Sequence, residues 1–98
     1  MSSEIEVSVV LPCLNEEETL GVCIKKIKEV FAREHIRGEI IVSDNGSHDR
    51  SMEIARAEGV ALVIEQRRGY GAAYLRGLKE VRGKYIVIGD SDNTYDFY

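Results

Sequence analysis

The sequence has little of several residue types, and each scarcity excludes a class of protein. Its 98 residues include two cysteines, one proline and no tryptophan, and the formal net charge at pH 7 is −4. Cys13 and Cys23 are too few for a disulfide framework and are not spaced as a metal-binding pair, so we expect reduced thiols in a cytoplasmic protein. An acidic chain lacks the basic face that nucleic acid requires. No apolar run reaches membrane-spanning length, and the first residues lack the basic and apolar regions of a signal peptide.

What the sequence does contain is a regular alternation of strand-like and helix-like segments. Short runs of β-branched residues predict four strands, at residues 7–11, 39–43, 61–64 and 85–89. Apolar residues at helical spacing predict helices at about 16–33, 49–58 and 72–82. Strands joined by helices pair in parallel through right-handed crossovers. The sequence therefore predicts an α/β fold, a Rossmann-like parallel sheet of order 3-2-1-4 with helices on both faces.

Local signals set the expected ends of these elements. Pro12 should end the first strand, because it has no N–H to donate. Asn15 should cap the first helix, with Glu18 completing a capping box. Gly83 should end the third helix, whose core face is expected to carry Leu75, Leu78 and Val81. The fourth strand is expected to be buried.

The acidic pair after the fourth strand is the most informative feature of the sequence. Asp90 and Asp92 are one residue apart, and in an extended segment both carboxylates can face one ion. Carboxylate oxygens suit Mg²⁺ or Mn²⁺ bridging a diphosphate, and the carboxyl ends of parallel strands are where open α/β sheets bind ligands. A solvated acidic turn is the alternative. A calcium loop is excluded, because Tyr95 stands where an EF-hand needs glycine.

A second acidic loop follows the second strand. Asp44, expected as the first residue past that strand, could accept a hydrogen bond from the imide of uracil or the Watson–Crick edge of guanine. The opposite wall of this base pocket would come from Pro12 to Glu17, through backbone groups and the Asn15 and Glu17 side chains. Helix capping is an equally good interpretation of Asn15 and Glu17. Ordinary turn formation accounts for four neighbours of Asp44, namely Asn45, Gly46, Ser47 and Asp49.

A basic, glycine-containing loop precedes the third helix. Arg67 and Arg68 could reach a base or a phosphate as forked donors, and Gly71 belongs to the same expected substrate-binding edge. A solvated surface pair is the alternative for Arg68. The spacing of Gly69 and Gly71 also imitates a dinucleotide-binding fingerprint, but Tyr74 replaces the third glycine that helix–strand packing needs there.

Four segments occur in one order along the chain: VVLPCLNEE at 9–17, DNGSHDRS at 44–51, RGYGAAY at 68–74 and GDSD at 89–92. Together they resemble family 2 of the nucleotide-sugar glycosyltransferases, which have the GT-A fold. The last segment is most similar to the polyprenyl-phosphate hexosyltransferase branch, the dolichol-phosphate mannose synthase type. Thr94 stands where those synthases often carry Gln as a further metal ligand.

The resemblance implies an inverting glycosyltransferase that takes a hexose from a UDP- or GDP-sugar. Asp44 and backbone near Pro12 would bind the base, while Asp90 and Asp92 would contact the ribose and the divalent metal. A polyprenyl phosphate acceptor, at the cytoplasmic face of a membrane, is already an anion and needs only in-line placement. A saccharide hydroxyl, the alternative acceptor, would need a general base.

The position of the acidic pair also bears on domain organisation. Because the chain ends six residues after Asp92, we expect residues 1–98 to be the nucleotide-binding, N-terminal part of a larger catalytic domain. Such a part would bind donor without turnover. An uncovered fourth strand would favour self-association.

Overall fold

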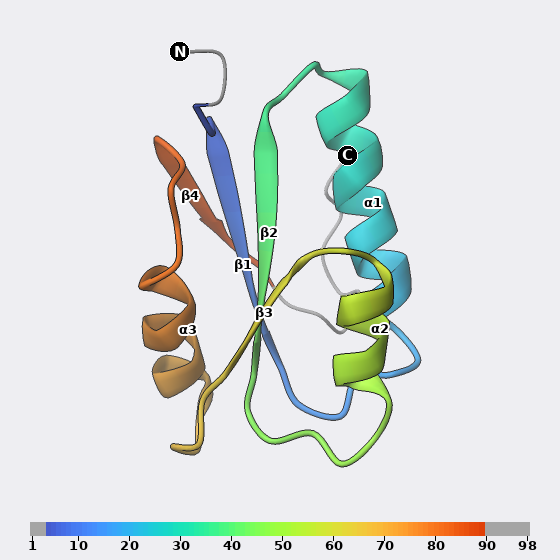
Figure 1. Cartoon of the computed structure of the whole chain (residues 1–98), viewed down its shortest axis with the longest axis vertical. Coiled ribbons are helices and arrows are strands. Elements are labelled where there is room, and N and C mark those ends of the chain that lie inside the picture. Colours follow the sequence, from blue (N-terminus) through green and yellow to red (C-terminus); the bar gives the residue numbers. More distant parts are fainter. Residues whose placement is uncertain (1–3, 90–98) are drawn as a thin grey trace.

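The computed structural model describes residues 4–89, and this part of the chain has the expected α/β fold. Its strands are β1 (Val7–Cys13), β2 (Gly38–Asp44), β3 (Ala61–Ile64) and β4 (Tyr85–Ile88), and its helices are α1 (Leu20–Arg33), α2 (Ser51–Ala57) and α3 (Tyr70–Leu78). The strands pair in parallel in the order β3-β2-β1-β4, which confirms the predicted topology. Helices α1 and α2 cover one face of the sheet and α3 covers the other (Figure 1).

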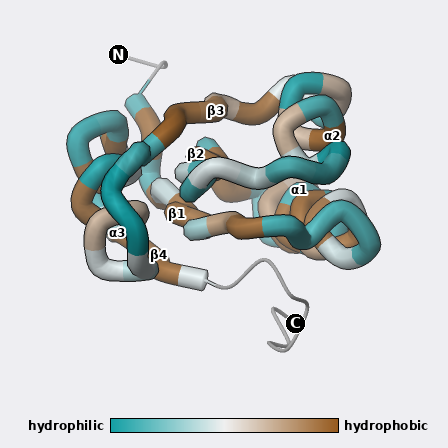
Figure 2. Tube along the Cα trace, turned by 90° about the horizontal axis from the view of Figure 1, so that it is seen from below, coloured by the Kyte–Doolittle hydropathy of each residue, from teal (hydrophilic) through white to brown (hydrophobic). Residues whose placement is uncertain are grey.

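The hydrophobic core lies between the sheet and the α1 and α2 layer. Alternate residues of a strand point to the same face, so each central strand contributes every second side chain. The core consists of Val9, Leu11, Cys13, Leu20, Cys23, Ile24, Ile27, Ile40, Val42 and Ala55. Its α1 members form the predicted apolar stripe of that helix. Figure 2 shows the sheet between α1 and α2 on one side and α3 on the other, with apolar segments along its strands.

The opposite face of the sheet packs against small residues of α3. Ala73 and Gly77 are its buried residues, whereas Leu75 is 58% exposed. A Cβ atom at Gly77 would lie 2.5 Å from Cγ1 of Val10, so only glycine lets the helix approach β1 this closely. The prediction that Leu75 faces the core was therefore wrong, whereas Leu78 is half-buried and Val81 lies half-buried beyond the end of the helix. The helical spacing of the large apolar residues predicted that they would face the sheet. Because α3 lies so close to the sheet, the small residues Ala73 and Gly77 are buried there instead.

Gly83 does not end α3, because the helix stops at Leu78 with Lys79 as its C-cap. Instead the Gly83 N–H donates to the Ser8 hydroxyl at 2.8 Å, and a Cβ at Gly83 would lie 2.7 Å from the Ser8 nitrogen. Its glycine identity thus lets the chain pass close to β1 before β4 begins.

Helix α1 begins at Leu20, four residues later than expected. Its N-cap is Thr19, which makes no side-chain capping bond. Asn15 has a positive φ of 53° and lies outside the helix, so its predicted capping role was wrong. The reason is tertiary, because the backbone N–H groups ahead of α1 are satisfied by another loop, as described below.

Two strands extend further than predicted. Pro12 lies within β1, opposite Ser43, rather than ending the strand. Val10 faces β4, since its carbonyl accepts from Gly89, and alternation turns the Pro12 nitrogen to that same side, past the last paired residue Ile88. The missing N–H therefore removes none of the bonds between the paired residues Val7–Val10 and Tyr85–Ile88. Asp44 is the last residue of β2, not the first beyond it, and it is fully buried.

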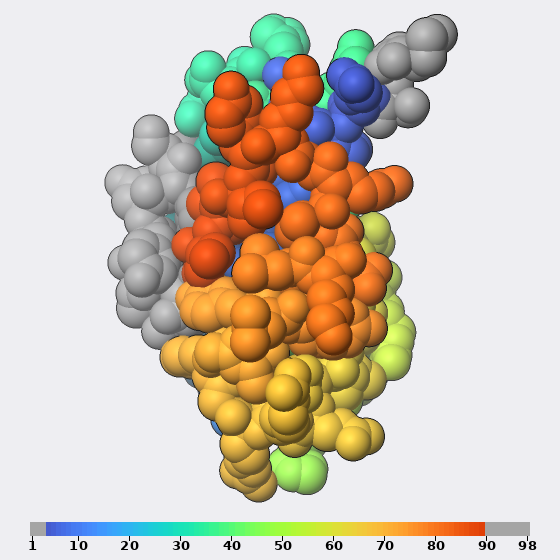
Figure 3. Space-filling model, turned by 90° about the vertical axis from the view of Figure 1, so that its left-hand side faces the viewer, coloured from blue at the N-terminus to red at the C-terminus, as the bar shows by residue number. Residues whose placement is uncertain are grey.

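Strand β4 lies at the edge of the sheet and its four residues are exposed. Their exposed fractions run from 41% for Val87 to 69% for Tyr85. Figure 3 shows β4 at the surface next to α3. The prediction of a buried strand was wrong, because an apolar run alone does not distinguish a central strand from an edge strand.

The amino-terminal edge of the sheet is tied together by Glu39. Its Oε2 accepts from the Ser8 hydroxyl at 2.6 Å and from the Arg82 N–H at 2.7 Å, and its Oε1 pairs with the Arg82 guanidinium at 3.2 Å. Burial raises the pKa of Glu39, but the bonds from Ser8 and Arg82 outweigh it and the net pKa is lowered. These contacts anchor the segment between α3 and β4.

Candidate nucleotide-binding site

Three loops meet at the carboxyl edge of the sheet and enclose a cavity of about 340 Å³. They are the β1–α1, β2–α2 and β3–α3 loops, which lie toward the viewer in Figure 2. The cavity is lined by Leu14, Asn15, Asn45, Gly46, His48, Ile64, Glu65, Gln66 and Arg68. Open α/β sheets bind their ligands at this edge. Another cavity, of about 300 Å³, lies near the amino-terminal ends of β2 and β3, away from these loops.

The β1–α1 loop is held by side chains of the β2–α2 loop and of Ser51, the first residue of α2. Three successive backbone N–H groups donate across the gap: Asn15 to Ser47 Oγ at 2.9 Å, Glu16 to Ser51 Oγ at 2.9 Å, and Glu17 to Asp49 Oδ2 at 3.0 Å. These bonds supply partners for donors that precede α1, which is why no local cap is required.

The same two loops exchange bonds in the opposite direction. The His48 N–H donates to Asn15 Oδ1 at 2.8 Å, and the Arg50 N–H donates to Glu17 Oε1 at 2.9 Å. The side-chain oxygens of Asn15 and Glu17 thus accept from backbone N–H groups of the β2–α2 loop. Neither residue is the N-cap of α1, which is Thr19.

Asp49 holds both loops at once. Its Oδ1 accepts from the Ser51 N–H at 2.9 Å, in addition to the bond from Glu17. Desolvation raises the pKa of Asp49, but the hydrogen bonds from Ser51 and Glu17 outweigh it, so the net pKa is lowered. The carboxylate therefore stays ionised through ordinary pH.

The Asp44 carboxylate, at the end of β2, holds the first residues of the β2–α2 loop by hydrogen bonds. Its Oδ2 accepts from the N–H groups of Gly46 at 2.9 Å and Ser47 at 2.7 Å, and its Oδ1 accepts from the Ser47 hydroxyl at 2.6 Å. Gly46 has a φ of +94°, which glycine adopts without strain. The Asp44 carboxylate is buried among these groups and is not one of the residues lining the cavity.

The β3–α3 loop is attached to the β2 end through Asn45. Its Nδ2 donates to the carbonyls of Glu65 at 3.0 Å and Arg67 at 2.6 Å, and its Oδ1 accepts from the Gly69 N–H at 2.9 Å. Within the loop, Arg67 pairs with Glu65 through Nε and Oε2 at 3.2 Å. Hydrogen bonding from Arg67 lowers the pKa of Glu65, so this carboxylate also remains charged.

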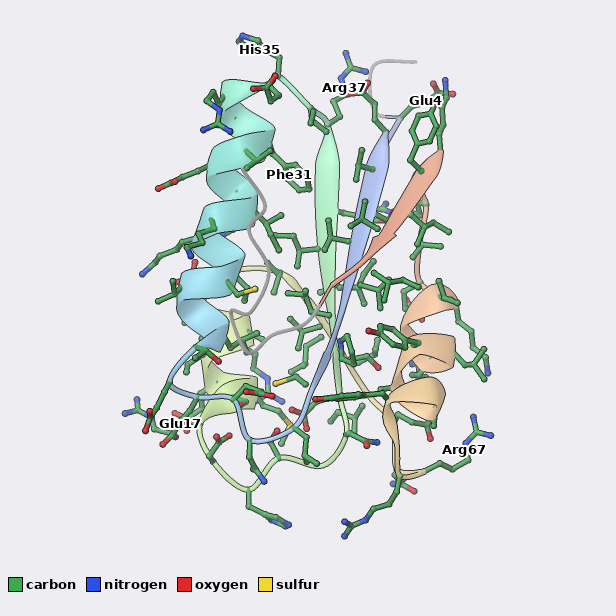
Figure 4. All side chains as sticks on the ribbon, turned by 180° about the vertical axis from the view of Figure 1, so that it is seen from behind. Glu4, Glu17, Phe31, His35, Arg37 and Arg67 are labelled. Atoms are coloured by element: carbon green, nitrogen blue, oxygen red, sulfur yellow. The ribbon has the colours of Figure 1, made fainter. Side chains whose placement is uncertain are left out.

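The other expected binding residues occupy different parts of this edge. Glu17 and Arg67 both lie at the carboxyl end of the sheet but on opposite sides of it (Figure 4). Pro12 is buried within β1. Gly71 is exposed in the first turn of α3, where an added Cβ would meet nothing within 4 Å.

The predicted metal ligands Asp90 and Asp92 lie outside the described residues. Just before them, the Gly89 N–H donates to the Val10 carbonyl at 3.0 Å, and the Tyr74 hydroxyl donates to the Gly89 carbonyl at 3.2 Å. The β1–β4 ladder therefore continues to Gly89. Within residues 4–89, no group of three or more His, Cys, Asp or Glu side chains could hold a metal ion.

Sequence reasoning missed the residues that build the loops. Asn45, Ser47 and Asp49 had been interpreted as turn formers, and Ser51 and Glu65 had no assigned role. The density of short polar side chains after β2 was a signal for hydrogen bonding, but it did not identify partners more than 20 residues away.

The family model described as glycosyl transferase family 2 matches residues 8–98. The chain belongs to this family. Among curated relatives, it is 46% identical over 90 residues to the low-salt glycan biosynthesis hexosyltransferase Agl6 of Haloferax volcanii, covering 92% of this chain and 22% of that protein. It is 34% identical over 99 residues to dodecaprenyl-phosphate galacturonate synthase of Rhizobium johnstonii, covering 94% and 29%.

Solved structures agree with the family assignment. Glucosyl-3-phosphoglycerate synthase of Mycobacterium tuberculosis, in complex with UDP, superposes with a TM-score of 0.78 at 34% identity, over 90% of this chain and 34% of that one. Mannosyl-3-phosphoglycerate synthase of Rubrobacter xylanophilus superposes with a TM-score of 0.85 at 30% identity, over 96% and 32%. The chain thus spans about a fifth to a third of the length of these proteins. Helices long and apolar enough to span a membrane are absent from the described residues.

Proposed function

We propose that this chain is the donor-binding part of an inverting glycosyltransferase, which transfers a hexose from a UDP- or GDP-sugar to a polyprenyl phosphate. The observation that carries the proposal is the cavity formed by three loops at the carboxyl edge of the sheet, in a chain of glycosyl transferase family 2. A cavity of about 340 Å³ is within the range of small-molecule sites. We place the nucleotide there, against the β1–α1 loop on one side and the β3–α3 loop on the other.

The predicted binding residues are proposed to act in different ways, some by contacting the nucleotide and others by holding a loop that contacts it. Asn15 keeps its Nδ2 to donate to a base oxygen, because its Oδ1 already accepts from His48. Asp44 contributes mainly by holding the loop that carries Asn45 and Gly46. Arg67, whose side chain is 70% exposed, and Gly71 lie on the α3 side, where a diphosphate could be reached. Glu17 and backbone near Pro12 complete the opposite wall.

Asp90 and Asp92 are proposed to hold Mg²⁺ or Mn²⁺. Their carboxylate oxygens suit these ions, and the ladder bond between Gly89 and Val10 brings the chain to the carboxyl edge immediately before them. Glucosyl-3-phosphoglycerate synthase of M. tuberculosis was crystallised with Mn²⁺ and UDP and with Mg²⁺ and UDP. A divalent ion there would stabilise the negative charge that develops on the leaving nucleoside diphosphate.

The acceptor is the part of the proposal that rests on relatives. Dodecaprenyl-phosphate galacturonate synthase and undecaprenyl-phosphate 4-deoxy-4-formamido-L-arabinose transferase, at 34% and 32% identity, are named for polyprenyl phosphates. A phosphate oxygen is already anionic, so the protein need only place it in line with the sugar C1. Such an acceptor would put the protein at the cytoplasmic face of a membrane.

A hydroxyl acceptor is a second candidate. The observation that favours it is the 35% identity to a glucosyl-3-phosphoglycerate synthase crystallised with Mn²⁺, UDP and phosphoglyceric acid. A hydroxyl would need a general base. Because the relatives are several times longer than this chain, we propose that acceptor-binding residues belong to the remainder of such a protein and that residues 1–98 alone bind donor without transfer.

Calorimetry with the 98-residue chain tests donor binding. We expect UDP or GDP to bind in the presence of Mn²⁺ and to bind much more weakly after the ion is chelated. Asp90→Asn and Asp92→Asn should abolish the effect of Mn²⁺, whereas Asp96→Asn is the matched control and should preserve it. Equal binding without metal would refute the metal role, and preferential binding of NADH would support a dinucleotide site instead.

The acceptor is tested with the full-length protein and radiolabelled UDP- or GDP-hexose. Polyprenyl phosphate and 3-phosphoglycerate are offered in separate reactions, and the anomeric configuration of the product is determined by NMR. A glycolipid of inverted configuration supports the proposal. Transfer only to phosphoglycerate would favour the second candidate, and retained configuration would refute inversion.

A further inference from the structure

Asn45, at the start of the β2–α2 loop, is bonded both to the end of β1 and to the β3–α3 loop. Its backbone N–H donates to the Cys13 carbonyl at 2.8 Å, which connects it to the end of β1. Its side chain makes the three bonds to Glu65, Arg67 and Gly69 described above. We propose that Asn45 is the positioning residue of the nucleotide site, which fixes the β3–α3 loop as a preformed wall of the cavity. The inference rests on the proposed donor-binding function, which it deepens.

The carboxamide is well matched to this position. Its nitrogen supplies two donors to two carbonyls, and its oxygen accepts from one N–H. A carboxylate of the same size could accept from Gly69 but could not donate to either carbonyl. An Asp at this position would instead place negative oxygen against the carbonyl oxygens of Glu65 and Arg67.

The bonds from Asn45 tie the exposed part of the β3–α3 loop to the end of β2, whereas the bonds from Arg67 to Glu65 stay within the loop. Beyond Glu65, whose N–H donates to the Asp44 carbonyl at 2.8 Å, residues 66–70 are exposed. Gly69 has a φ of +109° in a conformation that L residues rarely adopt, and its N–H is the group that Asn45 accepts from. The Asn45 bonds therefore remove conformational freedom that nucleotide binding would otherwise have to remove.

Asn45 lines the cavity, so direct contact with the base is the competing role. Both ends of its carboxamide are already used by the loop, and both Nδ2 hydrogens have acceptors. A residue that only positions the wall should affect UDP and GDP equally. A residue that reads the base should affect them unequally, because uracil and guanine present different hydrogen-bonding edges.

The test compares Asn45→Asp with a matched control at the other edge of the sheet. Ser8→Ala removes bonds to Glu39 and Gly83 but lies away from the three loops, so it lowers stability without touching the cavity. Binding of UDP and of GDP is measured with Mn²⁺ at a temperature at which both variants are folded by circular dichroism. Tryptic cleavage after Arg67 or Arg68 is measured in the absence of nucleotide.

We expect Asn45→Asp to weaken UDP and GDP binding by a similar factor, about tenfold, and to accelerate cleavage after Arg67 or Arg68. Ser8→Ala should leave both measurements unchanged. Unaltered cleavage in Asn45→Asp would overturn the inference, and so would unaltered affinity or an effect on one nucleotide only. If the wild-type chain binds neither nucleotide, the proposed function fails, but the cleavage measurement still decides whether Asn45 holds the loop.

Discussion

The backbone N–H of Asn15 donates to the Ser47 hydroxyl at 2.9 Å, across 32 residues of sequence. The same hydroxyl donates to Oδ1 of the buried Asp44 at 2.6 Å. A single side chain thus connects the start of the β1–α1 loop to the end of β2. These two hydrogen bonds, from Asn15 to Ser47 and from Ser47 to Asp44, set the spacing between two walls of the candidate nucleotide site.

Ser47→Ala should lower the free energy of unfolding by about 1–3 kcal/mol. The substitution removes the hydroxyl that donates to the buried Asp44 carboxylate and that accepts from the Asn15 backbone N–H. Urea denaturation at pH 7 measures the change. Glu53→Ala is the control, since the Arg50–Glu53 pair is exposed and 3.9 Å apart, and it should change stability by less than about 1 kcal/mol. Equal effects of the two substitutions would contradict the assigned role of Ser47.

Gly77→Ala should destabilise the fold by about 1–3 kcal/mol, because the new methyl group would overlap Cγ1 of Val10 at 2.5 Å. Gly71→Ala, in the same helix but facing open space, should be neutral or stabilise by up to about 1 kcal/mol. Thermal unfolding of both variants measures the difference. A neutral Gly77→Ala would show that α3 can move away from β1 at little cost.

Nucleotide binding by Gly71→Ala tests the expected substrate role of that glycine. A ligand that approaches the Gly71 backbone closely would be blocked by the added methyl group, and its affinity would fall without a loss of stability. Unchanged affinity would remove Gly71 from the substrate-binding set.

Glu39 should make stability depend on acidic pH. Its pKa is lowered in the folded state from a reference value of 4.5, so the folded protein binds this proton less tightly than the unfolded chain. The stabilisation is therefore present above the unfolded pKa and is lost as pH falls through the lower folded pKa. The stability difference between wild type and Glu39→Gln should shrink below pH 4.5. A difference that is independent of pH would show that ionisation of Glu39 contributes nothing.

Self-association is expected through the exposed edge strand β4. The N–H groups of Tyr85 and Gly89 face β1, so strand alternation turns those of Ile86 and Ile88 outward. Ile86→Lys should reduce dimer formation in sedimentation experiments. Val22→Lys replaces another half-exposed aliphatic residue, on α1, and should leave association unchanged. A monomeric wild-type chain at high concentration would contradict this prediction.

The sequence by itself determined the type and order of the elements. β-branched runs located β1 to β4 to within about two residues at either end, and the apolar spacing of α1 identified its buried stripe. Parallel order followed because helices connected the strands. Four short motifs in that order were enough to indicate the family, since they combine local turn chemistry with a fixed sequence spacing.

Only the tertiary structure decided which groups these residues contact. Asn15 has the chemistry of a helix cap, but the polar groups that reach it come from Ser47 and His48. Leu75 has the spacing of a core residue, but Gly77 lets α3 approach β1. Local propensity acts within a few residues, whereas hydrogen-bond satisfaction and close packing depend on segments that folding brings together, and at the loops of this sheet these long-range terms determined the structure.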